Sequence, residues 1–292
     1  MSIPEEVTDQ SESPLFYSSF LLFSEEDRKR LVNATVGVVG IGGVGSIAAE
    51  MLARAGIGAF KLADPDVFQD INLNRQLHAT MDTIGRNKAK SASERIRGIN
   101  PECKTNVFEK GIIRANVEEF CTGVDVLISQ GDAPSSIILI HRMASLLGIP
   151  VVTGARSSLE KRWRVKATVW NYKENSDMVR DDEVHYNEFV KIPFEKLTQE
   201  SLSVYDREHR ARRNEVFKKL ALSRPEAFES ISPEELRKKS DTGKNFYNRH
   251  VCSVVANTAG CLAATAALKI LLGGPETELE IDLWNGSYSR AL

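Results

Sequence analysis

The sequence is poor in cysteine and carries no excess of positive charge. Its 292 residues include four cysteines, Cys103, Cys121, Cys252 and Cys261, and none of them forms a C-x-x-C pair. This spacing argues against a thiolate zinc site and a disulfide scaffold, so we expect no zinc and take the reducing cytoplasm as the default location. The formal net charge is −2, which gives no global signal for nucleic-acid binding, although a local basic patch is compatible with it.

No cleavable signal pattern, internal repeat or low-complexity segment is recognisable. The run from Val251 to Leu272 is nearly apolar and long enough to span a bilayer. However, Asn257 and Lys269 lie within it, and small residues recur at helical spacing. We therefore expect a buried helix in a soluble dimer and no membrane partner. Hydrophobic residues make up 42% and charged residues 27% of the chain, as in ordinary soluble proteins.

A glycine-rich stretch near the start is the strongest motif in the chain. The apolar run Thr35 to Val39 leads into Gly40, Gly42 and Gly45, which have the G-x-G-x-x-G spacing. A helical pattern and a second apolar run follow, and Asp64 comes about 20 residues after the last glycine. This order of strand, turn, helix, strand and acid is typical of a nucleotide-binding fingerprint. The alternative is a glycine turn that merely lets a helix pack.

Each element of this motif has a physical role in binding a nucleotide. Gly40 permits a tight turn, and Gly42 has no Cβ, so a phosphate can approach the backbone there. Gly45 lets the helix lie close to the strand. Backbone N–H groups at the start of the helix then bind the anion, and Asp64 can accept a hydrogen bond from a ribose hydroxyl.

The residues that follow favour ATP over NAD. Asn72, Arg75, Gln76 and Lys88 place two cations and two amides soon after the acid. A dinucleotide enzyme binds its pyrophosphate mostly through backbone dipoles, whereas cleavage of a triphosphate needs cations where charge develops. Arg75 and Lys88 meet that need. The alternative is that both are solvated surface cations, as long charged side chains usually are.

These motifs resemble the adenylating family of the ThiF, MoeB and HesA proteins, which is related to ubiquitin-activating enzymes. The resemblance is strong over residues 35–155 and returns over 249–272. Within it, the runs 40–64 and 74–78 look especially like the threonylcarbamoyladenosine dehydratase branch, which acts on tRNA. The residues that match the family are Gly40, Gly42, Gly43, Gly45, Asp64, Asp66, Asn72, Arg75, Gln76, Lys88 and Asp132.

The resemblance implies ATP with Mg²⁺, an adenylated intermediate and a homodimer or pseudo-dimer. It also implies that Gly40, Gly42, Gly43, Gly45, Asp64, Asp66, Asn72 and Gln76 bind the nucleotide. In the family, an arginine near the N-terminus reaches the ATP of the partner subunit. The first arginine of this chain is Arg28, which lies beyond the expected position. Arg28 or a cation from the middle region is the candidate replacement.

The alternation of strand and helix patterns predicts an α/β fold. We expect a Rossmann-like, mostly parallel sheet with flanking helices, mixed C-terminal strands and a helical insertion. The expected parts are an N-terminal arm and helix (1–34), an ATP-binding core (35–172), a charged helical insertion over the site (173–248) and a C-terminal helix and strand (249–292). Asp64 and Asp132 both follow strands, where ligands bind in such sheets.

Several element boundaries are also predicted. We expect helices over 47–55, 87–99, 116–120 and up to Leu147, the last capped by Ser135 or Ser136. We expect strands over 104–110, 124–129, 149–153 and 162–170, the last with one exposed face.

The predicted chemistry is adenylation of a carboxylate. Asp132 is the candidate ligand of Mg²⁺, and its alternative role is that of an acid at a helix N-terminus. Arg75 and Lys88 would stabilise the charged phosphates in the transition state. Asn72 and Gln76 would position phosphate or substrate, and Asp64 would hold the ribose.

The substrate is less constrained than the first step. Residues 153–249 contain no cysteine, so we expect no enzyme thioester from this region and expect the substrate to supply the nucleophile. We favour a short precursor peptide, as in microcin C and pantocin-type relatives. Alternatives are threonylcarbamoyladenosine on tRNA or a ubiquitin-like carrier, and outside this class an NAD-dependent oxidoreductase or a nucleotide-sensing module. The charges of 173–248 predict a solvated face or a surface for an acidic peptide or RNA.

Overall fold

The protein is described here from a computed structural model. The structure describes residues 13, 16, 19, 21–156, 164–171, 194–208, 211, 252–274, 279–283 and 287–290. Most of the first 20 residues of the predicted N-terminal arm and helix (1–34) lie outside these residues, and so does most of the predicted insertion (173–248).

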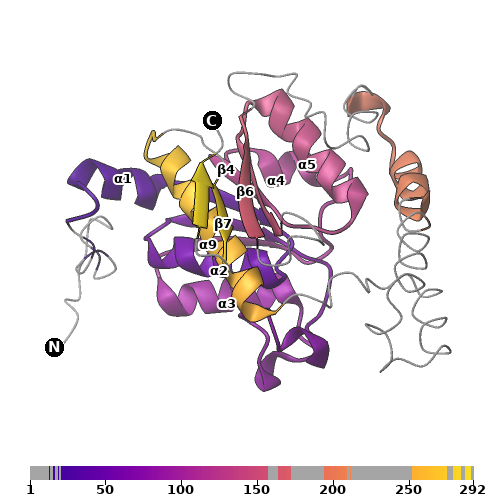
Figure 1. The fold of residues 1–292 in the computed structure, drawn as a ribbon. Coiled ribbons are helices and arrows are strands. Elements are labelled where there is room, and N and C mark those ends of the chain that lie inside the picture. The colour runs from indigo at the N-terminus through magenta and orange to yellow at the C-terminus, as the bar shows by residue number, and fades with distance from the viewer. Residues whose placement is uncertain are drawn as a thin grey trace.

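The core is an eight-stranded sheet in the order β3-β2-β1-β4-β5-β6-β7-β8. The labelled strands β4, β6 and β7 lie near the centre of the view in Figure 1, with helices around them. Neighbours among β1 to β5 pair in parallel, and β6, β7 and β8 add antiparallel neighbours. The predicted α/β fold with mixed C-terminal strands is therefore confirmed. The strands are β1 (Thr35–Val39), β2 (Ala59–Ala63), β3 (Lys104–Phe108), β4 (Val126–Ser129), β5 (Val151–Arg156), β6 (Arg164–Trp170), β7 (Leu279–Asp282) and β8 (Ser287–Arg290).

Helices cover both faces of the sheet. The helices are α1 (Glu25–Asn33), α2 (Gly43–Arg54), α3 (Lys88–Ile99), α4 (Val117–Cys121), α5 (Pro134–Leu147) and α9 (Ser253–Leu271). Short 3₁₀ turns between the described helices and strands include η3 (Asp70–Asn72), η4 (Met81–Thr83) and η5 (Phe194–Lys196). Helix α2 begins four residues before the predicted start at 47, because the end of the glycine loop is already its first turn.

Two hydrophobic clusters lie on opposite faces of the sheet. Successive residues of β4 belong to different clusters: Val126 and Ile128 pack with α2, α3 and α9, whereas Leu127 packs with α4 and α5. Such alternation with burial on both faces is expected of central parallel strands between two helical layers. The carboxyl ends of β1, β2 and β4 are thereby held at one edge of a rigid core.

Helix α9 is a core helix that packs against α2, β5 and β6. Among the described residues, it is the one helix long and apolar enough to cross a membrane by length and composition. A Cβ at Gly260 would lie 2.6 Å from Cγ2 of Ile47 on α2, so glycine is needed for this close approach. The prediction of a buried helix is confirmed, and Cys252 and Cys261 are exposed.

Two local predictions are wrong. Strand β6 lies between β5 and β7, and its burial alternates only at its start, where Arg164 and Lys166 are half-buried. From Ala167 to Trp170 it is buried, so the exposed face expected for 162–170 does not continue along the described strand. Helix α5 begins at Pro134 with Ala133 as its N-cap, so neither Ser135 nor Ser136 caps it. The backbone N–H of Ser135 instead donates to the carboxylate of Asp206, at 2.9 Å.

Asp206 belongs to the described part of the predicted insertion. Residues 199–208 are helical, and this segment packs against the α4 and α5 side of the core. The guanidinium of Arg114 lies 3.9 Å from the centre of the Phe194 ring, and its Nε donates to the carbonyl of Leu197 at 3.1 Å. This part of the insertion is therefore docked beside the start of α5.

Candidate functional site

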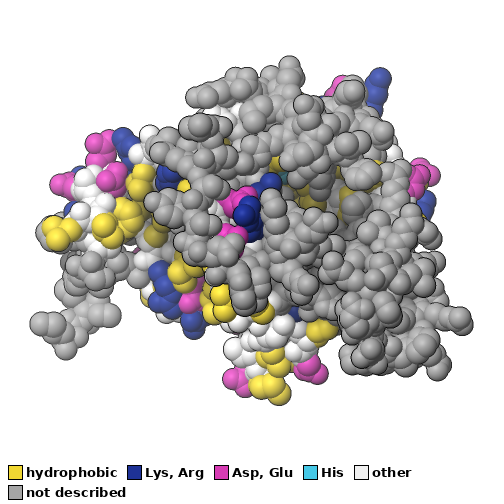
Figure 2. All heavy atoms as spheres, viewed as in Figure 1, with side chains coloured by type: hydrophobic (Ala, Val, Ile, Leu, Met, Phe, Trp, Pro, Cys, Tyr) yellow, Lys and Arg dark blue, Asp and Glu magenta, His cyan; other side chains and the backbone are white. Residues whose placement is uncertain are grey.

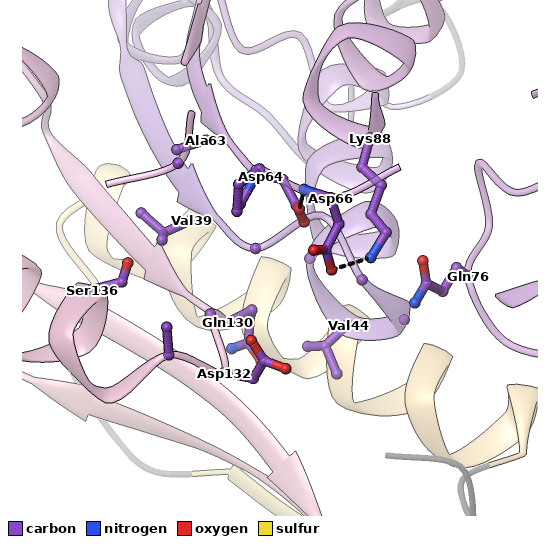
Figure 3. A pocket seen from close by; sticks show the side chains of 18 of the residues that line it. Val39, Val44, Ala63, Asp64, Asp66, Gln76, Lys88, Gln130, Asp132 and Ser136 are labelled. Atoms are coloured by element: carbon purple, nitrogen blue, oxygen red, sulfur yellow. Dashed lines mark hydrogen bonds and ion pairs between the residues drawn. The ribbon is translucent and has the colours of Figure 1, made fainter. Parts of the chain in front are cut away.

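A cavity of about 600 Å³ opens at the carboxyl ends of β1, β2 and β4 (Figure 3). Its volume lies within the usual range for small-molecule sites, about 300–1,000 Å³. The predicted site residues that line it are Gly40, Gly42, Gly43, Gly45, Asp64, Asp66, Arg75, Gln76, Lys88 and Asp132. The cavity also reaches Gly154 of β5 and the first turns of α9, so it is larger than the glycine loop alone requires.

The glycine loop has the geometry that its spacing predicts. Gly40 has a φ of 86°, and a Cβ there would lie 2.5 Å from the carbonyl of Gln130. A Cβ at Gly45 would overlap the carbonyl oxygen of Gly40, so these two positions require glycine. A Cβ at Gly42 would meet its nearest atom only at 3.8 Å, so Gly42 faces open space.

The start of α2 is a suitable place for an anion. Gly42 is its N-cap and Gly43 its first helical residue, and the first N–H groups of any helix have no partner within the helix. The helix dipole adds positive potential at the same place. A phosphate group beside Gly42 would accept hydrogen bonds from these N–H groups, and its negative charge would interact favourably with the helix dipole.

Asp64 holds the glycine loop in place. The carboxylate is buried, with 5% of the residue exposed, and accepts hydrogen bonds from the backbone N–H of Ile41 at 2.6 Å and of Asp66 at 2.9 Å. Burial raises the pKa of Asp64, and the charge of Lys88 acts in the opposite direction. Asp64 thus shapes the loop, and its contact with a ribose remains a prediction.

Lys88 is a buried cation at the edge of the cavity. Its Nζ lies 3.0 Å from Oδ2 of Asp66, and the two side chains are 8% and 66% exposed (Figure 3). Lys88 is the first residue of α3, which Asn87 caps by accepting a hydrogen bond from the N–H of Lys90. The alternative of a solvated surface cation does not describe Lys88.

The segment between η3 and η4 carries Arg75 and Gln76. The Arg75 guanidinium donates to the carbonyl of Ile71 and to Oδ1 of Asn74, both at 2.8 Å, and the residue lines the cavity. Asn72 lies outside the residues that line the cavity. Its side chain accepts a hydrogen bond from the N–H of Gln69, and its carbonyl accepts from Arg75 and Gln76. Asn72 therefore shapes this segment.

Asp132 lies in the loop between β4 and α5 and is exposed to the cavity. It is not the N-cap of α5, which is Ala133. The described residues include no group of three or more His, Cys, Asp and Glu that would form a protein-only metal site. Mg²⁺ needs no such group, because it binds one or two carboxylates together with phosphate oxygens and water. The donors present therefore fit a Mg²⁺ ion that arrives with ATP.

Gln130 is a cavity residue that the sequence analysis missed. It directly follows β4, and its side-chain Nε2 is buried without a hydrogen-bond partner among the described residues. The buried Oε1 of Gln76 is likewise unpartnered. Buried polar atoms normally find partners, so the two carboxamides have capacity left for a ligand. The available signal was the position of Gln130 at the carboxyl end of a buried strand.

Known proteins resemble this chain in sequence and in fold. A model of the ThiF family matches residues 17–291. The tRNA threonylcarbamoyladenosine dehydratase of Escherichia coli strain K12 is 37% identical over 142 residues, which cover 48% of this chain and 53% of that protein. The chain thus matches about half the length of this curated relative.

Two solved structures have the same fold. One is the E. coli tRNA N6-threonylcarbamoyladenosine dehydratase in complex with AMP, with a TM-score of 0.58 and 26% identity, covering 93% of this chain and 98% of that chain. The other is E. coli MccB with MccA-N7isoASN, with a TM-score of 0.62 and 16% identity, covering 97% and 73%. At 16% identity, the second shows a common fold alone.

Proposed function

We propose that this chain, which belongs to the ThiF family, activates a substrate carboxylate by transferring AMP to it from ATP. A carboxylate oxygen of the substrate attacks the α-phosphorus of ATP. The bond from this phosphorus to the bridging oxygen breaks, and pyrophosphate leaves with the electron pair. The acyl adenylate then reacts with a nucleophile of the substrate, and AMP is released. A carboxylate is already an anion near neutral pH, so the first step needs no general base.

The observation that carries this proposal is the combination of groups around the cavity. The start of α2 offers N–H groups to one phosphate, while Lys88 and Arg75 approach from the segments that follow β2. Cations placed where charge develops favour cleavage of a polyphosphate over binding of a dinucleotide. Asp132 would hold Mg²⁺, which when bound offsets the negative charge of the phosphates.

The binding step has a direct test. Calorimetric titrations of the protein with ATP and with NAD, both in the presence of MgCl₂, compare the two nucleotides. We expect ATP to bind and NAD not to bind. Binding of NAD together with absent binding of ATP would instead favour the oxidoreductase alternative. Binding of ATP without any pyrophosphate release in the substrate assays below would favour a nucleotide-sensing module.

For the substrate we propose a short peptide. The protein has 38 Lys and Arg against 40 Asp and Glu, and so lacks the basic excess that binding to many tRNA phosphates usually requires. The second candidate is threonylcarbamoyladenosine on tRNA, which is favoured by the 37% identity to a dehydratase of that name. A carrier protein remains the third.

Pyrophosphate release in the presence of ATP and MgCl₂ distinguishes these substrates. One assay contains a library of short synthetic peptides, and the other contains E. coli tRNA with or without threonylcarbamoyladenosine. Release that depends on peptide supports the first candidate. Release with the modified tRNA but not with the unmodified control would show that threonylcarbamoyladenosine on tRNA, and not a short peptide, is the substrate.

The role of Asp132 in holding Mg²⁺ can be separated from a role in folding. We expect Asp132→Asn to slow pyrophosphate release by more than about tenfold, as changes near metal sites typically do. A helix-terminal acid would contribute only about 1 kcal/mol to stability. Asp82→Asn is the matched control, because Asp82 is an exposed acid on η4, outside the cavity lining. A variant that melts early and keeps its rate would show that Asp132 serves α5 instead.

We also propose a homodimer in the cytoplasm, as the family resemblance implies. Several hydrophobic side chains are exposed on the segment between β2 and α3, which projects at the lower edge of the molecule (Figure 2). These are Val67, Ile71, Leu73, Leu77 and Met81. A cluster of exposed apolar side chains often marks an interface, and we assign this one to a second copy of the chain. Sedimentation of wild type and Met81→Glu tests it, because a dimer held by this surface would dissociate in the variant.

A further inference from the structure

Three separate segments must be aligned for the proposed site to bind a polyphosphate. They are the start of α2, which ends the glycine loop, the segment 72–79 with Arg75 and Gln76, and α3, whose first residue is Lys88. At the cavity itself, Asp64 joins the glycine loop to the start of α3, because its carboxylate accepts from the N–H of Ile41 and its carbonyl accepts from the Nδ2 of Asn87. A second set of contacts lies around the side chain of Glu50, which is not a lining residue of the cavity, and this set also includes the segment 72–79.

Glu50 lies on α2 and is buried, with 4% of its side chain exposed. From α3, the Nε and Nη2 atoms of Arg95 donate to Oε2 and Oε1 of Glu50, both at 2.9 Å. Such a two-point contact between guanidinium and carboxylate fixes orientation as well as distance. Helix α3, which begins with Lys88, is therefore tied to α2, which begins at the glycine loop.

The segment 72–79 is attached to the same face of α2. The Nε2 atom of His78 lies 3.4 Å from Oε2 of Glu50, close enough for an electrostatic contact, although the geometry is not that of a hydrogen bond. One helical turn earlier on α2, the hydroxyl of Ser46 accepts a hydrogen bond from the backbone N–H of Leu77 at 3.2 Å. Residues 77 and 78 directly follow Arg75 and Gln76, so these contacts place both cavity residues relative to the glycine loop.

Arg54 gives an internal comparison. Its Nε and Nη2 atoms both donate to Oε1 of Glu50, at 3.0 and 2.7 Å. However, Arg54 lies on α2 itself, four residues after Glu50, so its contact joins no two elements. The side chains of Arg54 and Arg95 are 50% and 52% exposed. The two arginines thus share a partner and a similar exposure and differ in whether they bridge helices.

We infer that Glu50 is a positioning residue that sets the geometry of the polyphosphate site by joining α2, α3 and the segment 72–79. A buried carboxylate is costly unless it is paired, and a hydrophobic contact would pack two helices without charge. The multiple charged contacts of Glu50 instead fix one relative placement of Lys88, Arg75 and the α2 N-terminus. This inference rests on the proposed use of ATP.

The experiment compares Arg95→Gln with Arg54→Gln. Displacement of a fluorescent ATP analogue, in the presence of MgCl₂, gives dissociation constants for ATP and for adenosine, which lacks the phosphates. We expect Arg95→Gln to weaken ATP binding about tenfold while adenosine binding is unchanged, since a misplacement of about 1 Å at a site has effects of that size or larger. Arg54→Gln should leave the ratio of the two constants within about twofold of wild type.

A conservative variant and the melting temperature complete the test. Arg95→Lys keeps the charge and loses the two-point geometry, so its ratio should lie between those of wild type and Arg95→Gln. One outcome is that Arg95→Gln and Arg54→Gln lower the melting temperature equally and have the same ratio of the dissociation constants for ATP and adenosine. In that case Glu50 contributes only to stability, and the inference is wrong. If the wild-type protein binds no ATP, the proposed function is wrong, and the inference about Glu50 is then wrong as well.

Discussion

The Nζ atom of Lys88 lies 3.0 Å from Oδ2 of Asp66, and the amine is buried whereas the carboxylate is exposed. A buried ammonium without a partner is costly, so Asp66 balances the charge of Lys88 in the absence of a ligand. A polyphosphate that enters the cavity offers more negative charge than one carboxylate does. Asp66 therefore balances the charge of Lys88 before a ligand binds, and the Lys88 ammonium is available to bind a polyphosphate that enters the cavity.

From this pair we predict that Lys88→Gln weakens binding of ATP much more than binding of adenosine. The expected loss in ATP affinity is about tenfold or more, since hydrogen bonds to charged groups contribute about 1.5–3 kcal/mol. Lys90→Gln, an exposed position on the same helix, is the control and should bind ATP as wild type does. Calorimetric titration of the three proteins measures this. Equal ATP affinity in all three would remove Lys88 from the site.

Two glycines of the loop should respond differently to the same substitution. Gly42→Ala adds a methyl group that meets its nearest neighbour only at 3.8 Å, so the variant should fold with little change in melting temperature. The methyl group would, however, occupy the space beside the α2 N-terminus, and ATP binding should be lost. Gly45→Ala would overlap the carbonyl oxygen of Gly40 and should lower the melting temperature. Thermal melting and ATP titration of both variants are the measurements, and normal ATP binding by Gly42→Ala contradicts the assignment.

Local sequence was sufficient to predict the glycine loop, Asp64 and the alternation of strands and helices. These features depend on residues close together in the chain, because a turn, a helix start and a strand end are each set by a few neighbours. Lys88 and Asp132 were also predictable, Lys88 from its place after the acid and both residues from the family resemblance.

Contacts between distant residues could not be predicted in this way. Asp206 accepts a hydrogen bond from the N–H of Ser135 at the start of α5, whereas the local sequence predicts Ser135 or Ser136 as the cap. The same applies to Glu50, whose partner Arg95 lies on another helix. Asn72 was assigned to the nucleotide through the family resemblance. In the structure its carbonyl and side chain shape the backbone around it, and its contact with a ligand stays a prediction.

Glu50 should make the stability of the protein depend on pH in the acid range. Contact with His78, together with the two arginines, holds the pKa of Glu50 well below its ordinary value of 4.5, although burial acts in the opposite direction. The unfolded chain therefore binds the proton more readily than the folded chain does. The contribution of Glu50 is complete above pH 4.5 and is lost as the pH falls below that value.

The variant Glu50→Gln isolates this effect from that of other carboxylates. It should melt at a lower temperature than wild type at neutral pH, because a buried carboxamide replaces a paired charge. Below pH 4.5 the difference between the two melting temperatures should shrink. Melting curves at a series of pH values measure it. A difference that stays constant from neutral pH into the acid range would mean that the Glu50 carboxylate is not stabilised by its contacts.

The last prediction is that no cysteine takes part in catalysis. Burial raises the pKa of the Cys103 and Cys121 thiols to about 12, so neither forms a thiolate at neutral pH, and the thiolate is the nucleophile. Cys252 and Cys261 are exposed, and Cys252 directly precedes α9, whose first turns line the cavity. The exposed pair therefore provides the sharper test.

The double variant Cys252→Ser/Cys261→Ser leaves the buried cysteines and their packing in place. We expect it to release pyrophosphate and AMP at the rate of wild type with the substrate identified by the assays above, and to form no thioester that hydroxylamine can trap. Its melting temperature should be close to that of wild type, because neither side chain is buried. If the folded variant releases pyrophosphate normally but never completes the second step, a covalent cysteine intermediate enters the mechanism. The acyl group would then pass through the enzyme, as expected for activation of a carrier protein rather than for a nucleophile on a peptide or tRNA.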